Sequence, residues 1–287
     1  MKTPKVLKGR PGRSAGGDIV NTVVLVLVGA FMFLPMLFVI SNAFKPLDEL
    51  FVYPPRLFVR NPTLDNFSML GAIFVDSWVP FSRYIFNTVF ITVTATLGQV
   101  FIASMAGYVL EKKRLPGMKA VFKTVVTSLM FTSAVTAIPK YVIMSRLGWI
   151  DTYAALIVPA AGASIGVFLM KQFMVNIPDS LLEAARVDGA GEQRIFWQIV
   201  MPNVKPAWMT LIIFTVQSTW GITGGTFVYR EELKTLPYAL NQIVSSGISR
   251  TGAGAAVSLL MMSVPIAVFI ITQRNVLQTM MSSGIKE

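Results

Sequence analysis

The residues whose types and spacing could do chemistry gather in one polar stretch, residues 176–205. Ser180 and Glu183 have the spacing of a capping box, in which a hydroxyl and a carboxylate satisfy backbone donors at the start of a helix. Gly189 follows where that helix would end, because glycine adopts the left-handed conformation at little cost. The pattern predicts a helix–turn–helix elbow that presents charged groups to another molecule, and not a catalytic centre.

Residue types that most catalysis requires are missing from the sequence. The chain has no histidine and no cysteine, which excludes disulfides, thiolate chemistry, metal sites built on these residues and nucleophiles activated by histidine. The sequence also has no Gly-x4-Gly-Lys-Ser/Thr phosphate loop. An intramembrane enzyme would need a Ser–Lys or paired-carboxylate arrangement, and no such pair falls within an apolar run. We therefore expect no enzyme activity, no metal site and no cofactor bound by this chain.

The composition is that of a membrane protein. Of the 287 residues, 54% are hydrophobic, the mean hydropathy is +0.63, and the apolar residues form long uncharged runs. The net charge of +11 arises from basic residues that flank these runs. The expected partners of these basic residues are therefore anionic lipid headgroups and not nucleic acid. The first run, residues 19–40, is too long for the apolar region of a signal peptide, which predicts a retained transmembrane helix.

The elements that must hold the elbow are six transmembrane helices in an all-α polytopic fold. We expect them at about residues 19–40, 84–110, 120–143, 153–174, 206–223 and 254–272, with the elbow between the fourth and the fifth. Sixteen of the 25 lysine and arginine residues lie on the side of the termini and the elbow. The positive-inside rule therefore predicts that both termini and the elbow are cytoplasmic.

Small and polar residues recur at three- and four-residue steps in the second predicted helix. They are Thr88, Thr92, Thr96, Gln99, Ala103 and Gly107. Such a stripe predicts close helix packing, with the lining of a translocation pathway as the alternative interpretation. The Gly162–Gly166 pair in the fourth helix also predicts close packing. If one helix face does line a pathway, its candidate residues are Thr92, Gln99 and Gln217.

Seven residues of the polar stretch stand at fixed spacings. They are Glu183, Ala184, Ala185, Asp188, Gly189, Ile199 and Pro202. At these spacings the stretch resembles the EAA loop of ABC-importer permeases, and the resemblance assigns these residues to coupling with ATPase subunits. The similarity extends over most of the chain and is to the carbohydrate branch, in particular to the maltose-type subunit without a large extracellular insert. Where many members of that branch have a Trp-Asn-Asp-Phe-like string, this chain has Trp-Gly-Ile-Thr-Gly-Gly at 220–225, which leaves the substrate open.

The resemblance implies a type I ABC-importer permease fold and a set of partners. These would be a second homologous permease, two cytoplasmic ATPase subunits that use ATP and Mg²⁺, and an extracellular solute-binding protein that delivers a sugar or oligosaccharide. The expected location of the protein is the inner membrane of a bacterial-type cell. The expected organisation is 1–82 for the N-terminus, first helix and extracellular loop, 83–274 for the transmembrane core with coupling loop 176–205, and 275–287 for a cytoplasmic tail. The alternative function is an autonomous channel or an ion-coupled secondary transporter, which usually carries ionisable groups inside its helices.

Overall fold

The computed structural model describes residues 15–75, 78–113 and 115–283, and every secondary-structure element in these ranges is helical. Residues 1–14 and 284–287, which contribute to the topology prediction, lie outside the described residues. The helices are α1 (Ala15–Phe44), α2 (Leu47–Leu50), α3 (Asp65–Val75), α4 (Phe81–Lys112), α5 (Met118–Ser128), α6 (Ser133–Arg146), α7 (Ala154–Ala161), α8 (Ser164–Met174), α9 (Asp179–Val187), α10 (Glu192–Arg194), a π-helical segment (Ile195–Val200), α11 (Met201–Asn203), α12 (Lys205–Trp220), α13 (Leu236–Ser245) and α14 (Thr251–Ser283).

The predicted all-α transmembrane architecture is confirmed. Four helical segments of the described chain are long and apolar enough to cross a membrane singly, and these are Gly16–Phe44, Phe81–Lys112, Ala154–Met174 and Ile248–Gln273. They correspond to the first, second, fourth and sixth predicted helices. Two bent helix pairs bring the number of possible spans to six.

The third predicted span, at about 120–143, was wrong as a single helix. The structure divides it into α5 and α6, whose axes differ by 113°. At the break, Thr132 has an extended backbone, and the Ser128 hydroxyl donates to the hydroxyl of Ser164 on α8 at 2.6 Å. The apolar composition of a segment predicts that it lies in lipid, but not whether the helix is continuous. Here the bend depends on local hydroxyl groups and on packing against a neighbouring helix.

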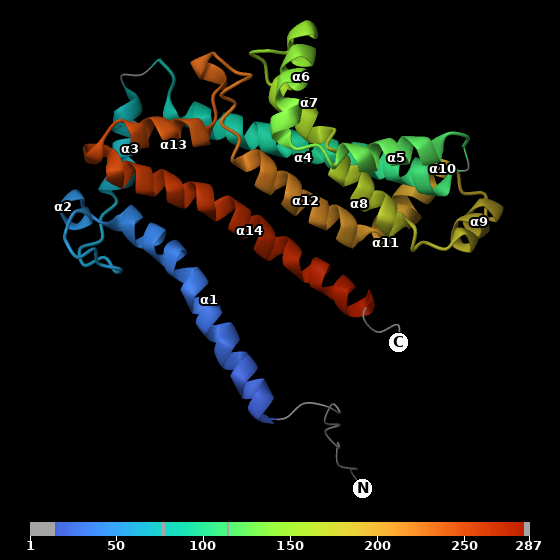
Figure 1. The fold of residues 1–287 in the computed structure, drawn as a ribbon, viewed down its shortest axis with the longest axis horizontal. Helices are drawn as coiled ribbons and strands as arrows, with labels where there is room; N and C mark the ends of the chain where they lie inside the picture. The colour runs from blue at the N-terminus through green and yellow to red at the C-terminus, as the bar shows by residue number, and fades with distance from the viewer. Residues whose placement is uncertain (1–14, 76–77, 114, 284–287) are drawn as a thin grey trace.

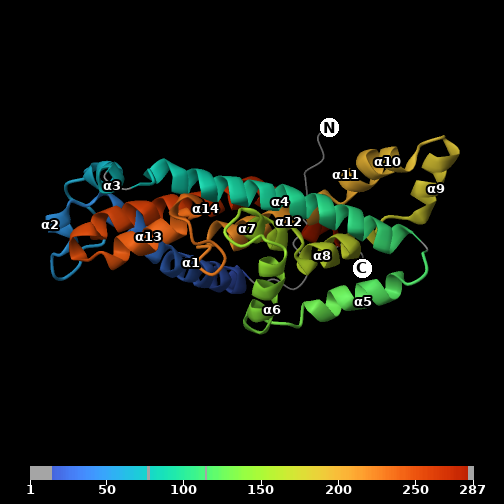
Figure 2. The ribbon, with the colours of Figure 1, turned by 90° about the horizontal axis from the view of Figure 1, so that it is seen from above.

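Helix α4 is the centre of the molecule, with α7, α8 and α12 packed along it (Figure 1). Helix α14 packs against α12 on one side and against α1 on another, while α1 diverges from the bundle toward its N-terminal end (Figure 1). The elbow lies at one end of the bundle and α2, α3 and α13 lie at the other, as the second view also shows (Figure 2). The first described residues of α1 and the last of α14 both point toward the end with the elbow.

The polar stripe of α4 packs against other helices, as the first interpretation predicts. All six stripe residues are buried. Gly107 lets α8 approach closely, since a Cβ added there would lie 3.0 Å from the backbone nitrogen of Lys171. Gly166 also faces α4, with Ala103 close to it, whereas Gly162 ends α7 at the break before α8. Close packing at the Gly162–Gly166 pair is therefore confirmed for the second glycine.

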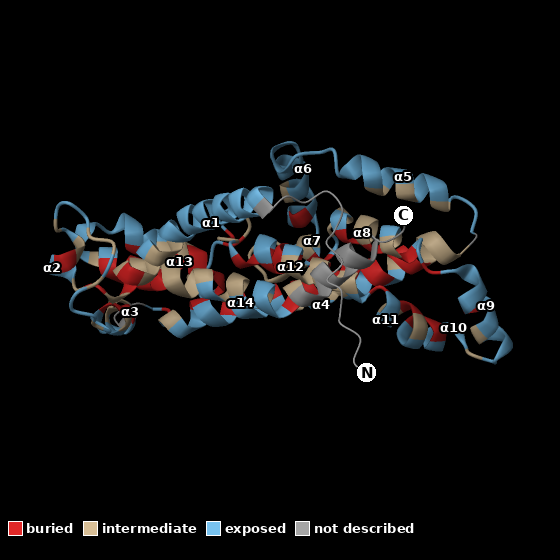
Figure 3. Ribbon diagram, turned by 90° about the horizontal axis from the view of Figure 1, so that it is seen from below, coloured by how far each residue is buried: buried red, intermediate tan, exposed pale blue. Residues whose placement is uncertain are grey.

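Burial is concentrated along the axis of the bundle, and much of the outer surface is exposed apolar side chain (Figure 3). Separate hydrophobic clusters lie at the elbow, under α3, α13 and α14, and around Ile91, Leu156 and Val228. An apolar exterior is the surface expected of helices in contact with lipid.

Candidate functional site

The elbow has two helical arms joined by a turn, as predicted. The first arm is α9, and the second is a continuous helical stretch from Glu192 to Asn203. The second arm meets α12 at an angle of 76°. Pro202 lies in the last turn of the second arm and Pro206 in the first turn of α12, so the chain bends between the two prolines and not at Pro202 itself.

The predicted capping box at the start of α9 was wrong. The helix begins at Asp179, with Pro178 as the capping residue and no side-chain hydrogen bond to the first backbone amides. Ser180 is therefore already inside the helix, where its hydroxyl is not placed to cap. Proline before the first helical residue fixes the backbone and favours this earlier start.

The turn at Gly189 follows the prediction closely. Gly189 has a φ of +80°, its amide donates to the carbonyl of Arg186 at 3.0 Å, and the amide of Ala190 donates to the carbonyl of Ala185 at 2.9 Å. This pair of hydrogen bonds is the Schellman arrangement that ends a helix with a left-handed residue. The turn thereby fixes the direction in which the second arm leaves α9.

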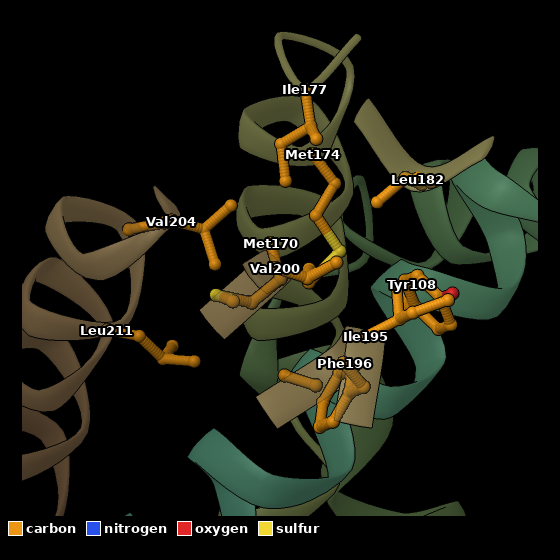
Figure 4. Packing of buried hydrophobic residues seen from close by; sticks show 12 residues of the cluster. Tyr108, Met170, Met174, Ile177, Leu182, Ile195, Phe196, Val200, Val204 and Leu211 are labelled. Carbon is orange, nitrogen blue, oxygen red and sulfur yellow. The ribbon is translucent and has the colours of Figure 1, made fainter. Parts of the chain in front are cut away.

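One side of the elbow is anchored in a hydrophobic cluster with α4 and α8. Leu182 of α9 and Ile195, Phe196 and Val200 of the second arm are buried there, and Figure 4 shows them gathered around Met170 and Met174 of α8. Ile199 is half-buried against the same cluster. The elbow is therefore close-packed against the ends of α4 and α8, and side chains packed in this way transmit strain from one element to the next.

The opposite side of the elbow is exposed and carries most of the residues to which the sequence resemblance assigned coupling. The exposed ones are Glu183, Ala184, Asp188, Gly189 and Pro202, while Ala185 is half-buried. Within the described part of the chain, the Glu183 carboxylate has no hydrogen-bond or ion-pair partner. Val187, beside Asp188, leaves 88% of its surface exposed. The structure thus brings a free carboxylate and an apolar side chain to one outward face.

A polar hub at Glu192 joins the elbow to α4, and the sequence analysis missed it. The Glu192 carboxylate accepts a hydrogen bond from the Tyr108 hydroxyl at 2.7 Å and lies 2.6 Å from the Lys113 ammonium. Arg186 of α9 approaches the same carboxylate at 3.3 Å. Hydrogen bonds from Lys113 and then Tyr108 lower the pKa of Glu192 to about 2. Tyr108 and Lys113 lie far from Glu192 in sequence, so only the basic residues at the end of the second helix could have indicated this contact.

A second set of polar contacts, made by Lys112, fixes the start of α9. The Lys112 ammonium donates to the backbone carbonyl of Ile177 at 2.6 Å and to the Asp179 carboxylate at 3.0 Å. The lysine side chain is 4% exposed, whereas that of Asp179 is 60% exposed. The C-terminal end of α4 thus holds both arms of the elbow, the first through Lys112 and the second through Lys113, which directly follows the helix.

The three candidate pathway residues have different surroundings. Gln99 is buried; its amide accepts from the Thr215 hydroxyl at 2.8 Å and donates to the carbonyl of Ala163 at 3.2 Å. Gln217 is exposed and lines a cavity of about 400 Å³ next to Phe214 of α12, and Gln99 lines the same cavity from α4. Thr92 is buried and does not line that cavity, and its hydroxyl has no hydrogen-bond partner in the described chain. Both glutamines therefore lie at this cavity, but the side chain of Gln99 is held by hydrogen bonds between helices, whereas that of Gln217 is exposed.

The combination of a helical membrane bundle with a packed helix–turn–helix elbow at one end is typical of one class of protein, the permease subunits of type I ABC importers. The chain belongs to the family of binding-protein-dependent transport system inner membrane components, whose model matches residues 12–282. It is 32% identical to the protein LplC of Bacillus subtilis over 203 residues, which cover 71% of this chain and 66% of that protein.

Two further similarities agree with this membership. A polygalacturonan/rhamnogalacturonan transport system permease protein, YtcP of Bacillus subtilis, is 30% identical over 239 residues, covering 80% of this chain and 81% of the relative. A chain of a bacterial ABC transporter involved in the import of the acidic polysaccharide alginate superposes with a TM-score of 0.78 at 21% identity, covering 92% of this chain and 99% of the other. The family consists of inner-membrane transport components, in agreement with the prediction that this chain is no enzyme.

Proposed function

We propose that this chain is a permease subunit of an ATP-driven importer for a sugar or oligosaccharide. It would form the translocation pathway together with a second, homologous permease, and two cytoplasmic ATPase subunits would bind the elbow. The membrane components of the family serve binding-protein-dependent systems, so an extracellular solute-binding protein would deliver the substrate. A transport system for polygalacturonan among the relatives supports a carbohydrate as the substrate.

The single observation that carries this proposal is the two-sided elbow. Its inner side is packed against α4 and α8, and its outer side presents Glu183 without a partner in the described chain. An ATPase that closes on the outer side would displace the ends of α4 and α8 together. Since α12 continues from the elbow through a bend of 76°, the displacement would also reorient the helix that carries Gln217.

The elbow is expected to be cytoplasmic, together with both termini. The 113° bend divides the third predicted span into α5 and α6, and α5 packs against α8. We propose that these two segments change position during transport, because alternating access needs a two-state rearrangement. A channel or an ion-coupled carrier would require neither the exposed elbow face nor an ATPase.

Co-expression with the ATPase and second permease from the same genomic neighbourhood tests the proposal. A detergent-purified complex that contains all three kinds of subunit, and that hydrolyses ATP faster when the loaded solute-binding protein is added, supports it. Purification of this chain alone, with solute uptake that continues when the ATPase is absent, would establish the channel or secondary transporter instead.

A further inference from the structure

A second cavity, of about 490 Å³, lies where α6, α7 and the end of α12 meet the loop 221–227. The loop lies beside α6 and α7 in both ribbon views (Figures 1 and 2). The cavity is lined by the hydroxyl-bearing residues Ser218, Thr219, Thr223 and Thr226, by Gly221, Gly224 and Gly225, and by apolar residues of α7 that include Leu156 and Pro159. The Phe227 ring closes one side and stacks on Tyr141 at a centroid distance of 6.2 Å. Hydroxyls, bare backbone and an aromatic face are the groups with which proteins bind sugars.

Lys140 of α6 is the one charged side chain among the described residues that line this cavity. Its ammonium is exposed and has no hydrogen-bond or ion-pair partner within the described chain. Three other lysines of the described chain, Lys112, Lys113 and Lys171, each lie within 3.0 Å of a carboxylate. A charged side chain inside a membrane protein is costly unless it meets water or an opposite charge. The Lys140 ammonium is therefore available to a ligand.

The loop that closes the cavity is held in place before any ligand arrives. Asp151 accepts hydrogen bonds from the backbone amides of Tyr229 and Arg230, both at 2.9 Å, and from the Arg230 guanidinium at 2.7 Å. The amide of Asp151 in turn donates to the carbonyl of Phe227 at 2.8 Å. Asp151 is thus already neutralised by Arg230 and does not compensate Lys140. A preformed wall with an unbalanced positive charge favours an anionic ligand, since little ordering is needed on binding.

We propose that this cavity is a binding subsite for an anionic sugar, in which the Lys140 ammonium recognises the carboxylate or phosphate group. The proposal rests on the function proposed above and narrows its substrate class. Ser218 lines both this cavity and the one that Gln217 lines, so the two cavities are neighbours along α12 and could hold successive sugar units. Five of the six residues of the sequence departure, 221–225, line this cavity, and three of these five are glycines, which place no side chain in it.

The test uses the purified complex of this chain with its second permease and ATPase in lipid nanodiscs, without the solute-binding protein. Binding of a galacturonate trisaccharide, its neutral methyl ester and glycerol 3-phosphate is measured by isothermal titration calorimetry. We expect the charged trisaccharide to bind roughly tenfold more tightly than the ester, which corresponds to one desolvated charge pair. The phosphate arm distinguishes a site for any anion from one for carboxylated sugars.

Lys140→Gln should remove the preference for the charged trisaccharide, and Lys140→Arg should retain it. Lys123→Gln is the matched control. Lys123 is also exposed, but it lines a different surface pocket, which is formed by α5 and the residues that directly follow it. Equal binding of trisaccharide and ester by the unmodified complex, or absence of binding, would overturn the proposal. So would loss of the second permease from the Lys140→Gln complex, which would mean that Lys140 pairs with an acidic residue of that subunit. A separate result, that the loaded solute-binding protein does not stimulate ATP hydrolysis by the complex, would instead count against the proposed function.

Discussion

The Lys113 ammonium lies 2.6 Å from the Glu192 carboxylate, although Lys113 directly follows α4 and Glu192 is the first residue of α10. The same carboxylate accepts from Tyr108 and is approached by Arg186. One side chain therefore joins both arms of the elbow to the helix at the centre of the bundle.

Replacing Glu192 by glutamine should loosen this joint. The side chain can still accept from Tyr108 but loses its attraction to Lys113, so ATP hydrolysis should continue with less solute moved for each ATP. Because the carboxylate is half-exposed, a double-mutant cycle with Lys113→Met should give a coupling of only about 0.2–1 kcal/mol in the stability of the complex. Additive effects of the two substitutions would show that the contact does not contribute.

The pH dependence of this contact has a definite sign. The pKa of Glu192 falls from 4.5 to about 2 in the folded chain, so the carboxylate contributes stability above its unfolded-state pKa and loses it as the pH falls from about 4.5 toward 2. The defect of Glu192→Gln in solute moved per ATP should therefore be the same at pH 6 and pH 8. A defect that changes between these values would assign the effect to another group.

Gly189→Val should impair coupling through the backbone alone. A Cβ at position 189 meets no atom within 4 Å, but the φ of +80° is strained for any residue with a side chain, at a cost of about 1–2 kcal/mol. Gly191→Val is the matched control, because Gly191 is exposed in the same elbow, has open space around it and has a φ of −69°. Solute uptake and capture of the ATPase are compared at equal membrane levels. Full uptake by Gly189→Val would mean that the elbow only connects two helices.

Glu183→Ala should weaken binding of the ATPase without destabilising this chain. The side chain makes neither the predicted helix cap nor any other polar contact with the described residues, so its removal leaves no buried group unpaired. The thermal unfolding midpoint of the purified chain should be unchanged while capture of the ATPase falls severalfold. A lowered midpoint with normal capture would assign Glu183 a purely structural role.

Gln99 and Gln217 should separate into two classes of variant. Gln99→Ala leaves the Thr215 hydroxyl and the Ala163 carbonyl without this partner, which typically costs about 1–3 kcal/mol for a buried polar group, so it should lower the unfolding midpoint. Gln217→Ala should leave the midpoint unchanged and alter the KM of solute uptake. Thr92→Val, which replaces an unbonded buried hydroxyl, should be neutral or stabilising. Unchanged uptake in Gln217→Ala would place substrate recognition in the partner permease or in the Lys140 cavity.

The membrane topology can be tested by labelling single introduced cysteines, because the chain has no cysteine of its own. Single cysteines at Asp65 and Gln193, both exposed and at opposite ends of the bundle, should react differently with a membrane-impermeant maleimide added to intact cells. Asp65→Cys should be labelled from outside, and Gln193→Cys only after the membrane is opened. The reverse result would invert the predicted orientation.

Most transmembrane helices were predictable because burial in lipid depends on composition and length. The helices found at Gly16–Phe44 and Phe81–Lys112 follow directly from two apolar runs. The bend between α5 and α6 was not predictable, because it depends on contacts such as Ser128 with Ser164 between helices distant in sequence. The prediction of a capping box at Ser180 was wrong by two residues, since the helix begins at Asp179 with Pro178 as its capping residue.

The candidate site was predictable where it depends on local sequence. Gly189 needs only its own backbone conformation and two nearby carbonyls, so its turn follows from the residue type. The Glu192 hub and the position of Lys140 could not be predicted, because their surroundings are supplied by α4 in the first case and by α7 and α12 in the second. Tertiary contacts of this kind leave no periodic signal along the chain.

Helix α1 depends on lipid for the solvation of its most apolar part. None of the most apolar window of Gly16–Phe44 is buried against the rest of the chain, so this window exchanges water for lipid and not for other helices. Its stability in the membrane therefore follows from its own length and apolar composition, and a charged substitution there should raise the free energy of membrane insertion without disturbing the packing of α4 against its neighbours.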